Sequence, residues 1–236
     1  MNYEEIFFEA DGISLKYITT GKGMPLLFLH GGGVSAFTYK NNFELLSQKY
    51  HVIAPDIPCF GESSIPNKLD SLKLDEITLV GHSFGGGIAL NLAPKNKKIS
   101  KLILIDSAGL SPNYSTLRFM YLLVAKTFRG FFLFGNKLMS LIILRDFFKE
   151  VFRNFLSITK IWKIVSNSIY RKYEVFDKIS QPTFIFWGNT DELFPKKYAQ
   201  KMDRLISNSK LEYVEGNHDW SLLMPQKFFH LICKVT

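Results

Sequence analysis

The sequence contains little cysteine and no long apolar run, and these absences limit the class of protein. Its two cysteines, Cys59 and Cys233, show neither metal-ligand spacing nor a disulfide framework. The segment nearest to a membrane span, Leu117–Leu144, is interrupted by four basic residues. The first twelve residues carry acids and no basic segment, which is not typical of a secretory signal. We therefore expect a reduced protein of the cytoplasm with no membrane span.

Signatures of cofactor binding are also missing. No G-x-x-x-x-G-K-[ST] motif occurs, and no lysine follows the glycines of Gly31–Gly33. This argues against reading these glycines as a loop that cradles phosphate. We expect no bound cofactor and no metal.

The net charge of +8 is concentrated in one segment. Residues 111–180 hold twelve Lys/Arg and four Asp/Glu, whereas the rest of the chain holds seventeen of each. The same segment carries fifteen of the 35 aromatic residues and has helical spacing throughout. No nucleic-acid recognition motif accompanies the charge, so a nucleic-acid partner is not expected.

Outside that segment, short apolar runs alternate with helical patterns. This alternation predicts an α/β fold with a mostly parallel sheet. Residues 1–110 and 181–236 form the predicted core, and residues 111–180 form a predicted helical cap inserted into it. The expected strands are Ile6–Ala10, Ile13–Thr19, Pro25–Leu29, His51–Ala54, Ile77–Val80, Leu102–Ile105, Thr183–Trp187 and Leu211–Val214.

The stretch Ile77–Gly87, ITLVGHSFGGG, carries the strongest chemical signal. An apolar strand leads into a sharp turn with Ser83 at its apex, and a helix-forming run follows. This is the context of a G-x-S-x-G nucleophile elbow, in which Gly81 and Gly85 remove side chains that would collide in the turn. An ordinary glycine-rich turn is the alternative, but the strand before the motif and the helix after it favour the elbow.

A serine nucleophile needs a base, and the chain offers five histidines. His218 follows the last strand, at the sheet edge where a parallel sheet collects its functional loops, and it is the predicted base. His82 adjoins Ser83, and its side chain is expected to point away from the site. His30 is expected to anchor the loop after its strand, while His51 starts a strand and His230 lies on the terminal helix.

The base needs an acid that holds its tautomer. Asp191, which follows the strand Thr183–Trp187, is the predicted orienting acid. Asp106, which follows the strand after the elbow helix, is its competitor. Both lie at the carboxyl ends of strands, so the spacing leaves the choice between them open.

Acyl transfer also requires backbone N–H groups aimed at the developing oxyanion. Phe84 directly follows the nucleophile and supplies one such group. The glycine loop after the third strand allows close backbone approach to a substrate, and Gly32 and Gly33 are its predicted contributors.

Taken together, these motifs resemble the α/β-hydrolase fold, in the branch with a serine nucleophile and a helical cap. The resemblance rests on the order Ser83…Asp191…His218, the HGGG sequence, the GNH loop and a loop similar to D-x-x-G-x-G-x-S that begins at Asp56. It covers nearly the whole chain outside the cap. It implies Ser83 as nucleophile, His218 as base and Asp191 as orienting acid. It also disfavours relatives with an aspartate nucleophile.

One departure from the family pattern concerns the crossover Ile57–Glu76. Its twenty residues leave room for two or three helical turns at most, where the family usually has a full helix. We therefore expect an exposed apolar patch on one face of the sheet.

The sequence thus predicts a serine hydrolase of the esterase type, acting on an ester or related acyl bond of a small-molecule substrate. Alternatives on the same three residues are hydrolysis of a C–C bond, a thioester, a lactone or a prolyl peptide. A non-catalytic binding protein that keeps the fold is a further alternative. The cap is either a lid with an aromatic core and solvated basic faces, or a lid whose apolar faces line an acyl pocket. In the second case its Arg and Lys side chains attract acidic groups or an anionic membrane surface. Physiological substrate and oligomeric state stay open.

Overall fold

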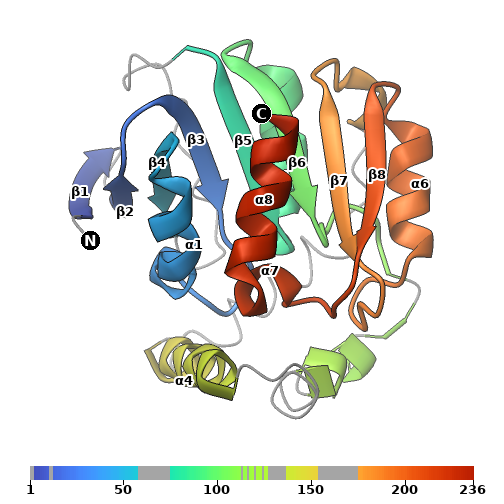
Figure 1. The fold of residues 1–236 in the computed structure, drawn as a ribbon. Helices are drawn as coiled ribbons and strands as arrows, with labels where there is room; N and C mark the ends of the chain where they lie inside the picture. The colour runs from blue at the N-terminus through green and yellow to red at the C-terminus, as the bar shows by residue number, and fades with distance from the viewer. Residues whose placement is uncertain are drawn as a thin grey trace.

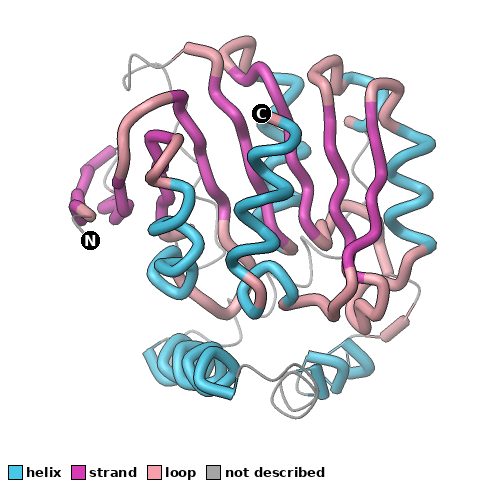
Figure 2. Tube along the Cα trace, in the orientation of Figure 1, coloured by secondary structure: helices cyan, strands magenta, loops and turns pink. Residues whose placement is uncertain are grey.

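The computed structural model describes residues 3–10, 13–57, 75–112, 114–115, 117–119, 121–123, 125–126, 137–153 and 175–236. An eight-stranded sheet forms the centre of the molecule, with helices on both faces (Figures 1 and 2). The strand order is β1-β2-β4-β3-β5-β6-β7-β8. The first two strands join the sheet in antiparallel fashion and the other six run parallel. The predicted mostly parallel α/β sheet is therefore confirmed.

The strands match the apolar runs expected from the sequence. β5, Ile77–His82, is buried along its whole length, as a strand covered on both faces must be. The strands are β1 (Glu4–Ala10), β2 (Ile13–Thr20), β3 (Met24–Leu29), β4 (Tyr50–Pro55), β5, β6 (Ile99–Ile105), β7 (Thr183–Gly188) and β8 (Ser209–Val214).

Two helical layers cover the sheet. α1 and α8 pack together on one face, with α7 beside them, whereas α2 and α6 cover the other face (Figure 1). The helices are α1 (Lys40–Leu46), α2 (Phe84–Leu92), α4 (Lys137–Arg153), α6 (Lys197–Leu205), α7 (Trp220–Leu223) and α8 (Pro225–Val235), with 3₁₀ segments η1 (Ala36–Tyr39), η4 (Ala93–Lys95) and η6 (Phe176–Lys178). The 3₁₀ turn η1 thus leads directly into α1, and α7 is a short helix just before α8.

The predicted cap contains α4 and further helical residues at 117–119, 121–123 and 125–126. α4 lies beyond the carboxyl ends of the strands (Figure 1). The limits of the cap at residues 111 and 180 stay a prediction. No helix in the described ranges is long and apolar enough to cross a bilayer.

The crossover between β4 and β5 lies outside the described residues, apart from its ends. The exposed apolar patch expected beside it is not found on the described strands. Leu27, Ile53 and Leu79 face the same side of the sheet as α2 and are all 5% exposed or less. Ile57 also packs against this cluster. The expectation of a bare sheet face is therefore wrong for these strands.

Candidate active site

Ser83 stands at the turn between β5 and α2 with φ 50° and ψ −118°. A positive φ is uncommon for a residue with a side chain and is a mark of stored strain at functional sites. A Cβ on Gly81 would lie 2.7 Å from the carbonyl oxygen of Gly85, and a Cβ on Gly85 would overlap the carbonyl oxygen of Leu29. Both flanking positions therefore have room for glycine alone, as expected of a nucleophile elbow.

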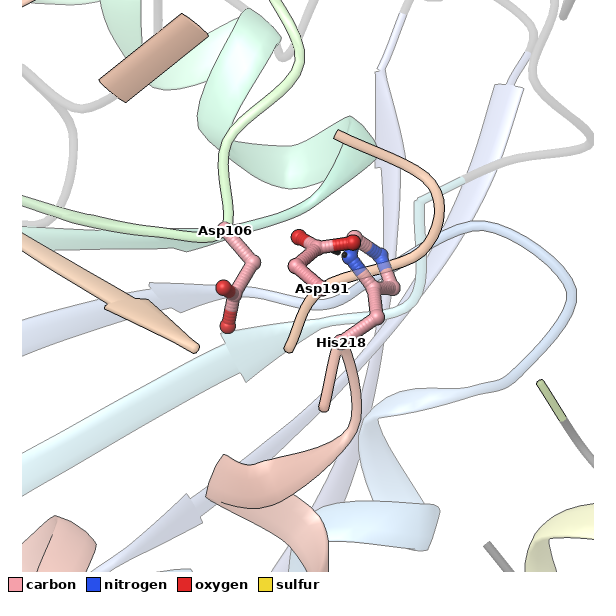
Figure 3. A group of neighbouring side chains, drawn as sticks. All are labelled: Asp106, Asp191 and His218. Atoms are coloured by element: carbon pink, nitrogen blue, oxygen red, sulfur yellow. Dashed lines mark hydrogen bonds and ion pairs between the residues drawn. The ribbon is translucent and has the colours of Figure 1, made fainter. Parts of the chain in front are cut away.

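His218 lies between Ser83 and Asp191. Its Nε2 is 2.9 Å from the Ser83 hydroxyl, and its Nδ1 is 2.8 Å from Asp191 Oδ2. Because a carboxylate only accepts, Nδ1 carries the proton and Nε2 is left to accept the hydrogen of the serine. The second Asp191 oxygen accepts the backbone N–H groups of Leu193 and Phe194 at 2.7 and 2.9 Å. The three predicted residues thus meet in one hydrogen-bonded row, of which Figure 3 shows the pair of His218 and Asp191.

Asp106, the competing acid, lies beside this row but is engaged elsewhere (Figure 3). Its Oδ1 accepts the backbone N–H of Gly188 at 2.7 Å. Burial, followed by the nearby charge of Asp191, raises the pKa of Asp106 well above its ordinary value. The raised pKa shifts Asp106 toward its protonated form, and the Nδ1–H of His218 donates to Asp191 instead.

These same side chains form a group that could hold a metal ion. Ligand atoms of Asp106, Asp191 and His218 lie within 4.8 Å of one another. However, the His218–Asp191 hydrogen bond joins two of those atoms, and a metal would have to replace it. The donor set fits a proton-transfer row better than a metal centre.

The glycine loop after β3 is fixed by His30. The backbone N–H of Ile57 donates to His30 Nε2 at 2.8 Å, so His30 Nδ1 carries the proton and donates it to the Gly31 carbonyl at 2.8 Å. In a trans peptide the N–H points opposite to the carbonyl. The bond from His30 therefore turns the N–H of Gly32 away from His30. The predicted anchoring role of His30 is confirmed.

The predicted oxyanion donors lie in the glycine loop and at the start of α2. Gly32 is exposed, Gly33 has φ +80°, and Phe84 supplies the first N–H of α2. A helix N-terminus favours developing negative charge. Asp56 Oδ1 accepts the N–H of Ala36 at 2.8 Å and so supports the far end of the glycine loop.

The remaining histidines are His51, His230 and His82. His51 hydrogen-bonds Thr19 Oγ1 at 2.9 Å, and His230 is exposed on α8. The His82 side chain, expected to point away from the site, instead packs against His218. Its ring centroid is 5.2 Å from that of His218, and its Nε2 is 3.0 Å from the His218 carbonyl oxygen. The prediction for His82 is wrong in this respect.

Described residues of the predicted cap contact the loops that carry the site. Lys126 Nζ lies 2.6 and 2.7 Å from the two carboxylate oxygens of Asp219, the residue after the base. Burial alone would raise the pKa of Asp219, but the Lys126 ammonium and the neighbouring His218 together outweigh it and lower the pKa of this carboxyl. On the other side of the site, the Thr38 hydroxyl donates to Asp146 of α4 at 3.0 Å. Sequence reasoning missed Lys126 because nothing local separates it from the other basic residues of the cap.

Comparisons with known proteins give a consistent picture. The model of the Alpha/beta hydrolase family matches residues 26–231. The 2-hydroxy-6-oxo-6-(2'-aminophenyl)hexa-2,4-dienoic acid hydrolase of Metapseudomonas resinovorans is 26% identical over 96% of this chain and 88% of its own. A solved serine hydrolase involved in carbazole degradation is 25% identical with a TM-score of 0.77, covering 99% of this chain and 98% of that one. An esterase from Exiguobacterium antarcticum shares the fold, with a TM-score of 0.72 at 24% identity over 97% of each chain.

Proposed function

The chain belongs to the alpha/beta hydrolase family, and from that premise we propose that it is a serine hydrolase cleaving an ester or related acyl bond of a small molecule. The observation that carries the proposal is the row of Ser83, His218 and Asp191 at hydrogen-bond distances, on a strained elbow. Ser83 is half-buried, so its side chain is not fully enclosed by the protein.

In the proposed mechanism, Ser83 Oγ attacks the acyl carbon while His218 Nε2 takes its proton. Asp191 holds the Nδ1–H of His218 and stabilises the imidazolium. The N–H groups of Phe84 and of Gly32 or Gly33 receive the oxyanion. His218 then protonates the leaving group and later activates the water that hydrolyses the acyl-enzyme.

Hydrolysis of p-nitrophenyl esters from acetyl to dodecanoyl tests the proposal, with Ser83→Ala as the paired variant. We expect activity in the wild type and loss of about 10³–10⁶-fold in the variant, while the chain-length optimum sizes the acyl pocket. Labelling by a fluorophosphonate probe is the second readout. A wild type that neither turns over any ester nor reacts with the probe would favour the non-catalytic binding protein.

Hydrolysis of a C–C bond is the second candidate. It is favoured by the 26% identity to a dienoic acid hydrolase over nearly the whole chain. A wild type that is labelled at Ser83 but turns over no ester would point to this reaction, or to the thioester, lactone and prolyl-peptide alternatives. Assay with a dienoic keto acid separates the first of these from the rest.

We further propose that the protein works in the cytoplasm and that its cap contacts anionic membrane surfaces. On α4 the outward positions Leu138, Leu141, Phe148 and Phe152 are at least 50% exposed. The exposed Arg145 lies within the same face, and an outward apolar face with cations is typical of helices that lie on a bilayer. Co-sedimentation with vesicles containing phosphatidylserine, but not with neutral vesicles, is the expected result. A Leu138→Ser/Phe152→Ser variant should lose it.

A further inference from the structure

The buried side chains of Tyr39 and His82 connect two parts of the site that lie far apart in the sequence. Tyr39 ends η1, and His82 ends β5. The Tyr39 hydroxyl lies 2.5 Å from His82 Nδ1 and 3.4 Å from the backbone nitrogen of Gly31, in the glycine loop. At the other end, His82 Nε2 lies 3.0 Å from the carbonyl oxygen of His218. A single chain of hydrogen bonds therefore runs from the glycine loop to the backbone of the base.

The donor and the acceptor in each of these hydrogen bonds follow from the groups at the two ends of the series. The His218 carbonyl only accepts, so His82 Nε2 must carry a hydrogen. Burial, and then the neighbouring His218, lowers the pKa of His82 to about 3, so the ring is neutral and its Nδ1 is an acceptor. Tyr39 must then donate its hydroxyl hydrogen to Nδ1, and its oxygen accepts the N–H of Gly31. The tautomer of His82 is thus fixed by hydrogen bonding on both nitrogens.

Packing leaves the hydrogen-bonded side chains of Tyr39 and His82 little freedom to move. Tyr39 and His82 are 0% and 2% exposed. The Tyr39 ring packs on Phe28 with ring centroids 4.6 Å apart. A Cβ on Gly31 would lie 2.9 Å from His82 Nδ1, so the loop is seated directly against the imidazole. The connection is rigid and desolvated, which is where a hydrogen bond contributes most to positioning.

We propose that Tyr39 and His82 are positioning residues that set the distance between the oxyanion loop and the base of this serine hydrolase. The inference rests on the proposed function, since it concerns how the same site is assembled. The Gly31 N–H is held by Tyr39, which places the next peptide, with the Gly32 N–H, relative to the elbow. The His218 carbonyl is held by His82, which places the imidazole relative to Ser83. A misplacement of about 1 Å in such a site can cost about 100-fold in rate.

Three variants and a matched control test the inference. Tyr39→Phe keeps the ring and removes the hydroxyl, and His82→Leu removes both hydrogen bonds. His82→Gln keeps one acceptor and one donor. Tyr50→Phe is the control, because Tyr50 is 3% exposed in the same core cluster but its hydroxyl bonds Cys233 and Thr236 at the chain terminus. The readouts are kcat and KM for a p-nitrophenyl ester, the rate of Ser83 labelling by a fluorophosphonate, and thermal unfolding.

We expect Tyr39→Phe to lower kcat and the labelling rate about tenfold and His82→Leu about 100-fold, with KM changed less than about threefold. His82→Gln should recover most of the loss, and the double variant Tyr39→Phe/His82→Leu should be no worse than His82→Leu alone, because both act through one chain. Unchanged kcat and labelling in folded Tyr39→Phe and His82→Leu, or losses matched by Tyr50→Phe, would overturn the inference. A wild type that is neither labelled nor active would instead refute the proposed function. If His82→Leu does not fold, Tyr39→Phe and His82→Gln decide the question.

Discussion

Replacing His82 by glutamine is expected to make the fold less sensitive to acid. The pKa of His82 is lowered to about 3 in the folded chain, from an ordinary value of 6.5, mainly by burial. Between these two pH values the unfolded chain binds a proton at this position and the folded chain does not. Stability therefore falls as the pH falls below about 6.5, and this penalty is absent above it.

The size of the effect follows from the same two values. Each pH unit below the unfolded pKa costs about 1.4 kcal/mol, so the penalty at about pH 5 is about 2 kcal/mol. For a chain of this length that corresponds to a decrease of about 4–8 °C in Tm. The charged and titratable groups that face the His82 ring are His218, Asp219, Lys126 and Tyr39. They remain in the variant, so the difference between wild type and variant isolates His82.

Urea unfolding followed by tryptophan fluorescence at about pH 8 and about pH 5 measures the difference. The free energy of unfolding should fall by about 2 kcal/mol more in the wild type than in His82→Gln over this interval. His230→Gln, which removes an exposed imidazole on α8, is the matched control and should behave like the wild type. Equal pH dependence in wild type and His82→Gln would show that His82 is not held neutral by burial, and the proton directions derived for the Tyr39–His82 chain would lose their support.

Three further predictions follow from individual contacts. Gly85→Ala should lower the free energy of unfolding by about 1–3 kcal/mol, because its Cβ would overlap the carbonyl oxygen of Leu29; denaturant unfolding measures this, and an unchanged midpoint would contradict the contact. Lys126→Met should lower the free energy of unfolding by about 3–5 kcal/mol, because it leaves the buried Asp219 carboxylate unpaired. Adding Asp219→Leu should restore much of this free energy; no restoration would show that the ion pair is not the cause. Asp191→Asn should lower kcat about 10⁴-fold by disturbing the tautomer of the base. Asp106→Asn should lower kcat less than about fivefold, because the Nδ1–H of His218 donates to Asp191 and not to Asp106; equal losses would return Asp106 to the role of orienting acid.

The choice between these two aspartates shows what the sequence could not decide. Asp106 and Asp191 both follow buried strands, and β6 and β7 are neighbours in the sheet. Sequence spacing places both at the same edge, so it identifies the candidates but not their partners. What separates them is the loop after β7, where the Leu193 and Phe194 N–H groups turn the Asp191 carboxylate toward His218. That turn depends on backbone conformation and has no simple counterpart in residue spacing.

The elbow was predictable for the opposite reason, because its chemistry is local. The need for glycine at positions 81 and 85 arises from atoms within a few residues of Ser83 and from the adjacent strand β3. The strand, the tight turn and the helix of the elbow can therefore be recognised within a short window of sequence. The Tyr39–His82 contact joins positions 43 residues apart, and the Lys126–Asp219 pair joins positions 93 apart. Such pairs leave no periodic pattern, so only the folded arrangement identifies them.

The Tyr39–His82 and Lys126–Asp219 contacts share one property, since each of them connects to a loop that carries a part of the site. Tyr39 reaches the glycine loop and, through His82, the base. Lys126, in the predicted cap, forms an ion pair with Asp219, the residue after His218. A parallel sheet brings its loops to one edge but does not fix their mutual distances to the fraction of an ångström that proton transfer requires. In this chain, buried polar contacts between the loops supply that precision, which is why substitutions at Tyr39, His82 or Lys126 should change rate or stability although none of the three need touch the substrate.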